Sequence, residues 1–353
     1  MNGTGPSNKS AMERREFCHL IGCAALVACA GSLTGCARAL EWSENQHAQP
    51  ADVAGGGSTE PSGSVQPTGS VEPTGSASET ATPTPISPDV VVRIGQDPAA
   101  RLASAVAALG GWERFVKAGA RVVVKPNVLT GRAPEYAVTT DPDLLEAIIR
   151  SSYDAGAREV IVLDRPTSSA RAAFEVSGLL AATERAGGSV KFLTDRNFKK
   201  VTIPNARVLT EWPMVRDIFE ADTLINVPIA KTHGMAVLTM SMKNLMGILG
   251  SSRGQIHQSF ASKICDVATV VKPDLVVLDA RRILTAHGPS GGSLADVAEL
   301  NTLVVGTNMA SVDAYGTTLF GKQPTDLEYL VQAAERGIGE IRLERLLIDK
   351  VEM

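Results

Sequence analysis

The sequence predicts an α/β domain with a mostly parallel sheet flanked by helices, placed after a disordered tether. Two observations support this expectation. Apolar runs rich in β-branched residues alternate with helical stretches over residues 89–353, and residues 37–88 consist mainly of Gly, Ser, Thr and Pro. Alternating strands and helices are typical of parallel sheets that helices cover on both faces. We therefore expect a single domain over residues 89–353.

The expected elements follow one another at short spacing. A helix starts at Thr140-Asp141-Pro142, because Thr or Asp can cap a helix and proline suits its first turn, and Gly156 ends it. The expected strands are 90–94, 121–124, 159–164, 189–193, 223–226, 272–279 and 302–305. The expected helices are 99–116 with an interruption at 110–111, 140–154, 170–186, 240–249 and 326–336.

The first 35 residues resemble a bacterial twin-arginine signal peptide. Arg14-Arg15 precedes a short apolar run from Leu20 to Ala30, and this run is shorter than the roughly 20 residues that span a bilayer. We therefore expect export by the twin-arginine machinery. Met12 is an alternative to Met1 as the start.

Cys36 is the expected membrane anchor. It ends Leu33-Thr34-Gly35-Cys36, which resembles a lipobox with Cys36 as the lipid-modified first residue of the mature chain. Residues 36–88 then form the lipidated cysteine and a linker, in which the unit Gly-Ser-Val-X-Pro-Thr occurs at 63–68 and 69–74. Such a composition cannot bury enough apolar area to order a chain. The expected product is a lipoprotein on the extracytoplasmic side, at the cell surface or in the periplasm, held to the membrane through Cys36 only.

Charge and cysteine content exclude some classes of protein. The net charge is −4, and residues 89–353 carry 30 basic and 30 acidic side chains, so no nucleic-acid partner is expected. Four of the five cysteines lie within residues 1–36, which leaves Cys265 alone in the domain. No Cys-ligated iron–sulfur cluster is therefore expected there. A Walker loop is missing from the sequence.

Polar residues follow several expected strands. In parallel α/β sheets, ligands bind beyond the carboxyl ends of strands. The residues at these positions are Lys125, Asn127, Asp164, Arg165, Asn226 to His233, and Asp279 to Arg282.

An ordered set of short motifs resembles the family called domain of unknown function 362, over Val90–Gly321. The motifs are Lys125-Pro126-Asn127, Pro228 to Lys231-Thr232-His233, Lys243-Asn244-Leu-Met-Gly247, His257, Asp279, Gly288-Pro289, and Ala310 with Asp313. Ile229 replaces a common basic residue, and Asn308-Met309 replaces a usual Asp-Pro. The family has no generally established activity, so the resemblance implies the positions of site residues and no reaction. Many members carry a ferredoxin-like iron–sulfur module. This chain has no Cys motif for such a module.

The residues themselves favour an anion site. Positive side chains, amides and glycines suit a ligand that carries phosphate or carboxylate groups. The expected anion-binding residues are Lys125, Asn127, Lys243, Asn244 and Arg253, and the candidates for catalysis are His233, His257 and Lys231. The alternative is a metal site made of His233, His257, His287 and Asp279, which offer nitrogen and oxygen ligands.

Three functions remain open at this point. The first is an exported enzyme-like domain that binds a cofactor, metal or anion of unknown identity. The second is a non-catalytic lipoprotein that captures a solute or a partner. The third is an interaction module without a small-molecule site. Twin-arginine cargo is exported folded, often with a cofactor already bound, and this favours the first function.

Overall fold

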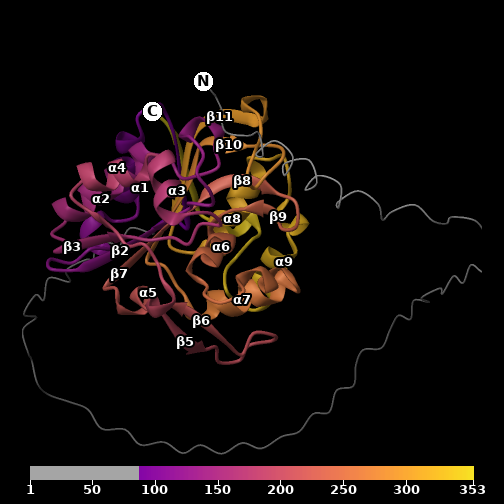
Figure 1. The fold of residues 1–353 in the computed structure, drawn as a ribbon. Coiled ribbons are helices and arrows are strands. Elements are labelled where there is room, and N and C mark those ends of the chain that lie inside the picture. Colours follow the sequence, from indigo (N-terminus) through magenta and orange to yellow (C-terminus); the bar gives the residue numbers. More distant parts are fainter. Residues whose placement is uncertain (1–86) are drawn as a thin grey trace, which may run out of the picture. The chain divides into compact units, whose positions relative to one another are not determined.

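The computed structural model describes residues 87–353, which form one α/β domain (Figure 1). A ten-stranded mixed sheet runs through its middle, and a separate two-stranded sheet lies beside it. The expectation of a mostly parallel sheet flanked by helices is confirmed. The expected signal peptide, Cys36 and nearly all of the linker lie outside the described residues.

Six of the nine strand pairings in the main sheet are parallel, and the strand order is β12-β1-β11-β10-β7-β2-β3-β4. The hairpin of β8 and β9 continues from β10, and β5 pairs with β6 in the second sheet. The strands are β1 (Val90–Ile94), β2 (Arg121–Pro126), β3 (Glu159–Val162), β4 (Ser189–Val190), β5 (Phe198–Thr202), β6 (Glu211–Val215), β7 (Thr223–Val227), β8 (Ile229–His233), β9 (Val237–Thr239), β10 (Leu275–Leu284), β11 (Val297–Gly306) and β12 (Ile348–Glu352).

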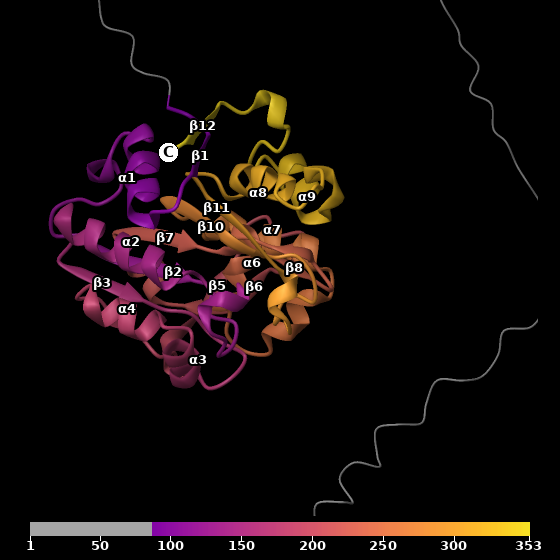
Figure 2. The ribbon, with the colours of Figure 1, turned by 90° about the horizontal axis from the view of Figure 1, so that it is seen from above.

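Helices cover both faces of the main sheet (Figure 2). The α-helices are α1 (Pro98–Ala108), α2 (Pro142–Asp154), α3 (Ala170–Val176), α4 (Leu179–Arg185), α5 (Asp217–Glu220), α6 (Ser241–Asn244), α7 (Phe260–Val270), α8 (Met309–Thr318) and α9 (Glu328–Glu335). Two short 3₁₀ helices also matter for the site, η4 (Leu245–Ile248) and η5 (Arg253–His257).

The strands divide their side chains between two apolar layers. In β2, Val122 and Val124 belong to the cluster that packs under α1 to α4, and Val123 belongs to the cluster under α7 to α9. β10 alternates in the same way. Since successive side chains of a strand point to opposite faces, an uninterrupted apolar strand must be covered on both sides.

Four expected elements differ in the structure. The expected helix 240–249 is α-helical only over Ser241–Asn244 and continues as the 3₁₀ helix Leu245–Ile248, and the expected helix 99–116 ends at Ala108 and is followed by the 3₁₀ turn Trp112–Arg114. The expected helix 170–186 is divided into α3 and α4, because Gly178 adopts a left-handed conformation with φ 75°, which ends a helix. The expected strand 189–193 is paired only over Ser189–Val190. The cap of α2 is confirmed, since the Asp141 carboxylate accepts hydrogen bonds from the amides of Asp143 and Leu144.

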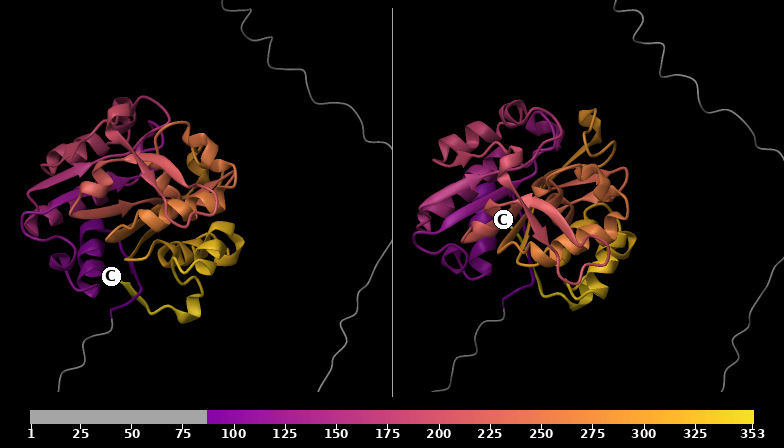
Figure 3. Two further views of the ribbon diagram at one scale, coloured as in Figure 1. Left: turned by 90° about the horizontal axis from the view of Figure 1, so that it is seen from below. Right: turned by 60° about the horizontal axis from the view of Figure 1, so that its bottom comes forward.

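The sequence did not indicate the β5–β6 sheet or the β8–β9 hairpin. The β5–β6 connection lies at the same end of the domain as α7 (Figure 3). It is held against α7, since the buried Asp266 carboxylate accepts hydrogen bonds from the amides of Arg207, Val208 and Leu209. Among residues 87–353, no helix has both the length and the apolarity that crossing a bilayer requires.

Asp313 of α8 binds the first residues of the short helix α6. Its buried carboxylate accepts hydrogen bonds from the Ser241 amide at 2.7 Å, the Ser241 hydroxyl at 2.5 Å and the Met242 amide at 3.0 Å. The first amides of a helix have no partner within the helix, so Asp313 acts as the cap that α6 lacks. Asp313 thereby sets the position of Lys243 and Asn244 on α6.

We expect Asp313→Ala to lower the free energy of unfolding by about 3 kcal/mol, because two buried amides lose their acceptor. Asp97→Ala removes the exposed cap of α1 and is the control, with an expected loss of about 1 kcal/mol. Urea unfolding of the full chain measures both. Equal losses in the two variants would contradict the role of Asp313.

Candidate functional site

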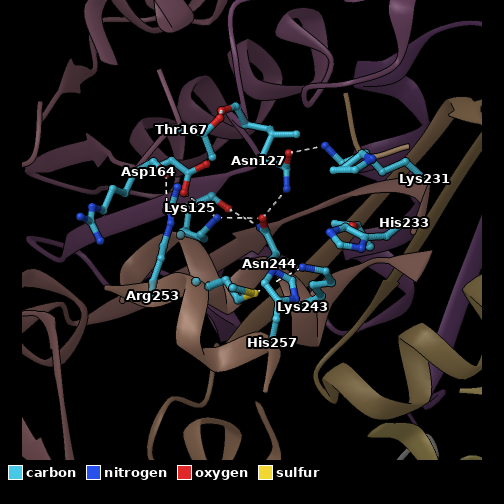
Figure 4. A pocket seen from close by; sticks show the side chains of 17 residues that line it. Lys125, Asn127, Asp164, Thr167, Lys231, His233, Lys243, Asn244, Arg253 and His257 are labelled. Carbon is cyan, nitrogen blue, oxygen red and sulfur yellow. Dashed lines mark hydrogen bonds and ion pairs between the residues drawn. The ribbon is translucent and has the colours of Figure 1, made fainter. Parts of the chain in front are cut away.

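A cavity of about 280 Å³ lies beyond the carboxyl ends of β2 and β3 (Figure 4). The strand β8, the helix α6, and the 3₁₀ helices η4 and η5 supply most of its other walls. The lining residues are Lys125, Asn127, Leu129, Asp164, Arg165, Thr167, Lys231, His233, Thr239, Lys243, Asn244, Met246, Gly247, Arg253, Gly254, His257 and Pro289. We call this cavity the lysine pocket.

The lysine pocket is strongly positive within a domain that is otherwise balanced in charge. Its five cationic side chains face a single carboxylate, that of Asp164, and they are Lys125, Arg165, Lys231, Lys243 and Arg253. Low-dielectric walls strengthen the field of such charges, so the pocket attracts anions.

Lys125 is held by the protein at all three of its donor positions. Its ammonium donates to the Pro126 carbonyl and to Asn244 Oδ1, both at 2.8 Å, and pairs with Asp164 Oδ1 at 2.9 Å. The side chain is 2% exposed, and this burial lowers the pKa of Lys125 in spite of Asp164. An ammonium has only three hydrogens, so Lys125 has none left for a ligand.

Two asparagines join the walls of the lysine pocket. Asn127 Nδ2 donates to Asn244 Oδ1 at 2.9 Å, and Asn127 Oδ1 accepts from Lys231 Nζ at 2.9 Å. Asn244 Nδ2 donates to Asn226 Oδ1 and to the Lys125 carbonyl. Both amide groups are thus engaged with protein partners, and they fix the positions of the lysines.

Lys231 is partly free to bind a ligand. Its ammonium donates to Asn127 Oδ1 and to the Val138 carbonyl at 2.5 Å, which leaves one hydrogen. Burial, followed by the neighbouring Lys243 charge, lowers the pKa of Lys231 to about 7. Across the hairpin, Lys231 lies opposite Thr239, whose buried hydroxyl has no hydrogen-bond partner among the described residues.

Lys243 has no oxygen partner among the described residues. Its Nζ contacts Met246 Sδ at 3.3 Å and lies 5.2 Å from the centre of the Phe260 ring. The side chain is 6% exposed, and burial lowers the pKa of Lys243 to about 7, with Arg253 as a second cause. A buried ammonium normally has hydrogen-bonding partners, so Lys243 is the lysine of this pocket that lacks an oxygen partner among the described residues.

His233 is fixed as a neutral donor. Its Nδ1 accepts hydrogen bonds from the amides of Met235 at 3.1 Å and Ala236 at 3.2 Å. A ring nitrogen that accepts carries no proton, so the proton of the neutral ring is on Nε2. Burial, and then the charge of Lys243, lowers the pKa of His233 to about 3.

His257 stacks on His233, with ring centroids 5.4 Å apart and an interplanar angle of 24°. Its Nδ1 is buried and has no hydrogen-bond partner among the described residues. Burial lowers the pKa of His257, and the charges of Lys243 and Arg253 add to the effect. Both rings are therefore neutral near pH 7 and available for proton exchange.

Two arginines close the opposite side of the lysine pocket. Arg165 donates to the carbonyls of Leu249 and Ser251, and Arg253 Nη1 donates to the Arg165 carbonyl. Burial lowers the pKa of Arg253, but a guanidinium remains charged at neutral pH. Arg253 has further N–H groups for a ligand.

Gly247 permits the close contact of η4 with the ion pair. A Cβ at this position would lie 1.8 Å from Asp164 Oδ1 and 2.7 Å from Lys125 Nζ. No larger residue fits there unless the ion pair moves.

The structure brings together all candidate residues for catalysis and anion binding, since each of them lines the lysine pocket. It does not bring the proposed metal ligands together. His287 is largely exposed and pairs with Asp296 at 2.9 Å, and Asp279 is buried where it accepts the Asp141 amide at the start of α2. Within residues 87–353, no group of three or more His, Cys, Asp or Glu side chains could hold a metal ion.

Several lining residues were absent from the site expected from sequence. Asp164 and Arg165 follow β3. The tendency of ligands to bind beyond the carboxyl ends of parallel strands predicted that they lie near the site, but it did not predict which side chains they contact. The sequence offered no reason to place Thr239 and Met246 at the site, because hydroxyl and thioether side chains are common in any protein core. Asp164 is the important omission, since it is the only carboxylate of the lysine pocket.

Comparisons with known proteins place most of this domain in one family. The family described as Domain of unknown function (DUF362) matches residues 122–318. A thylakoid-associated protein of Synechocystis is 25% identical over 244 residues, which cover 67% of this chain and 74% of that protein.

Two solved structures match part of this chain. A protein from Thermotoga maritima matches with a TM-score of 0.35 and 14% identity, over 52% of this chain and 51% of the other. The lactate racemase apoprotein from Thermoanaerobacterium thermosaccharolyticum matches with a TM-score of 0.39 and 12% identity, over 62% of this chain and 54% of the other. This chain thus spans about half the length of each solved structure.

Replacing Gly247 by alanine should lower the free energy of unfolding by about 3 kcal/mol, because the added methyl group separates Lys125 from Asp164 and leaves both charges buried. The matched control is Gly254→Ala, where no atom lies within 4 Å of the new Cβ and a change within about 0.5 kcal/mol is expected. Urea unfolding followed by circular dichroism compares the two variants. If Gly247→Ala were as stable as Gly254→Ala, the ion pair would not depend on this glycine.

Proposed function

The chain belongs to the family of domains of unknown function described as DUF362, and we propose that its lysine pocket binds a small carboxylate- or phosphate-bearing ligand and transfers protons to or from it. The observation that carries this proposal is the charge of the pocket, where five cations face one carboxylate. An anionic ligand would supply the missing counter-charge and would be desolvated in the same step.

The lining residues divide into two groups. Lys125, Asn127 and Asn244 have their polar groups engaged by the protein, and they form the scaffold of the pocket. Lys231, Lys243 and Arg253 retain donors, and they bind the anion. The residues proposed for proton transfer are Lys231, whose pKa burial lowers to about 7, and the neutral rings of His233 and His257 that line the same pocket.

Groups that titrate near neutral pH favour an enzyme over a passive binding protein. Pure anion capture needs cations that stay charged, whereas burial brings Lys231 and Lys243 close to the point of losing their protons. Their mutual repulsion favours one charged and one neutral amine at pH 7. Such a pair can act as an acid and a base in one pocket.

We further propose that the domain works outside the cytoplasm on a lipid anchor. The support is the order of Arg14-Arg15, the apolar run and Cys36, followed by a repetitive linker. The Synechocystis relative is described as thylakoid-associated, which is consistent with a membrane location.

Anion binding should weaken as pH rises from 6 to 9. The folded pKa values of Lys231 and Lys243 are about 7, so both are protonated at pH 6 and both are neutral at pH 9. We expect the affinity for citrate and for inorganic phosphate, measured by titration calorimetry on the full chain, to fall at least about 10-fold across this range.

Lys243→Met should lower the affinity at pH 6 by at least about 10-fold, and Lys272→Met, at an exposed lysine, should leave it unchanged. If the affinities for citrate and phosphate depended neither on pH nor on Lys243, the proposal would be wrong. Release of a changed product from a bound ligand would identify an enzyme, and recovery of the ligand unchanged would identify a binding protein.

Cys36→Ser should abolish lipid attachment, because serine has no thiol to modify. Growth of expressing bacteria with a radiolabelled fatty acid, followed by phase partition in detergent, measures attachment. The unchanged chain should take up label and enter the detergent phase, and the variant should do neither. Cys29→Ser is the matched control and should retain the label. Labelling of Cys36→Ser would rule out this anchor.

A further inference from the structure

The lysines of the pocket differ in how many of their hydrogens the protein already uses. Lys125 donates twice to oxygen and forms an ion pair with Asp164, Lys231 donates twice, and Lys243 has no oxygen partner among the described residues. The three side chains are almost equally buried, at 2%, 1% and 6% exposure. Burial therefore does not distinguish them, and hydrogen bonding does.

The surroundings of Lys243 suit a neutral amine. The thioether of Met246 is a weak acceptor, and the face of Phe260 is apolar. Its charged neighbours are Lys231 and Arg253, both cations, and its titratable neighbours include His233 and His257. The face of the Phe260 ring attracts an ammonium only weakly, and no oxygen among the described residues accepts a hydrogen bond from Lys243. An uncharged amine needs no such acceptor, and it has the free electron pair that a nucleophile needs.

We propose that Lys243 is a nucleophile that forms an imine with a ligand carrying both a carbonyl group and a carboxylate or phosphate group. The inference rests on the proposed anion site and deepens it, since it names the chemical class of the ligand. The anionic group binds Arg253, and the third hydrogen of Lys231, beside the Thr239 hydroxyl that lacks a partner among the described residues, is left for the carbonyl oxygen.

The reaction is a condensation without oxidation or reduction. The electron pair of Lys243 Nζ attacks the carbonyl carbon, and the carbonyl π pair moves to oxygen. One proton passes from nitrogen to that oxygen, which gives a carbinolamine. The protonated Lys231 gives a proton to the hydroxyl group, which leaves as water while the C=N bond forms. The iminium proton then returns to Lys231. One carbonyl and one amine thus yield one imine and one water.

The pKa of Lys243, lowered to about 7, agrees with this role. About half of the Lys243 amines are then neutral at pH 7, against about one in a thousand or fewer for an ordinary lysine. The neutral His233 and His257 rings lie beside Lys243 and add no positive charge that would repel a cationic intermediate. The pocket thus admits an anion and keeps one amine unprotonated.

Borohydride trapping tests the inference on the full chain at pH 7. The probes are glyoxylate and pyridoxal 5′-phosphate, which carry an aldehyde beside a carboxylate or a phosphate, and acetaldehyde is the uncharged control. Borohydride converts an imine into a stable secondary amine, and peptide mass mapping locates it. We expect Lys243 to be labelled at least about 10-fold more than any other lysine by one or both anionic probes, and not by acetaldehyde.

Two variants complete the test. Lys243→Arg keeps the positive charge but cannot form an imine, so the selective adduct should disappear. Lys272→Arg should retain the adduct. Labelling spread evenly over the lysines, no adduct at Lys243 with either anionic probe, or equal labelling by acetaldehyde would overturn the inference. Calorimetry with citrate and phosphate decides separately whether the anion site exists.

Discussion

The buried ion pair between Lys125 and Asp164 is the contact on which the arrangement of the lysine pocket depends. Lys125 ends β2, Asp164 follows β3, and the same ammonium also binds Asn244 of α6. Asp164 additionally accepts the Val128 amide at 2.6 Å, which fixes the chain as it leaves β2. A single pair of charges thus connects two strands, a loop and a helix. Removing either partner would leave a charge buried without compensation.

The remaining charges of the pocket are not balanced within the domain. Lys231, Lys243 and Arg253 lie near one another with only Asp164 as an acidic neighbour, and desolvation lowers the pKa of all three. Burying like charges together opposes folding, so the fold must hold them with contacts made elsewhere. The Asp313 cap of α6 and the Asn127–Asn244 hydrogen bond are such contacts. Free energy stored in this way is available to a ligand that neutralises the charges.

The sequence predicted site residues correctly where a reactive side chain lies at the end of a regular strand or helix. Lys125 and Asn127 lie at the carboxyl end of a strand that is clearly apolar in sequence. Because ligands bind beyond such strand ends in parallel sheets, both residues were predicted to lie at the site. The grouping of Lys243 and Asn244 with them came from the family resemblance. The metal hypothesis joined His287 and Asp279 to His233 because residue type and order were all that could be compared. Their separation follows from the path of β10 and of the loop after it, which no local pattern encodes.

The tautomer of His233 could not be predicted from the sequence, because it too depends on the path of the chain. It depends on the amides of Met235 and Ala236, and thus on the turn of a hairpin that the sequence did not reveal. The same holds for Lys243. Its residue type was visible, but its lack of an oxygen partner is a property of the space around it. For His233 the protonated nitrogen is set by main-chain amides, which any sequence supplies, and for Lys243 it is the packing of side chains distant in sequence that withholds an oxygen partner.

The contact at Gly247 has a consequence for how this site can diverge. Since its Cα faces Asp164 and Lys125 without room for a Cβ, position 247 is coupled to positions 125 and 164. A lineage that acquires a side chain at 247 must also lose or shorten one of the two charged residues, and a lineage that keeps the pair must keep the glycine. The three positions should therefore vary as one unit among descendants of this domain, and an exception would mark a pocket that has been rebuilt for another purpose.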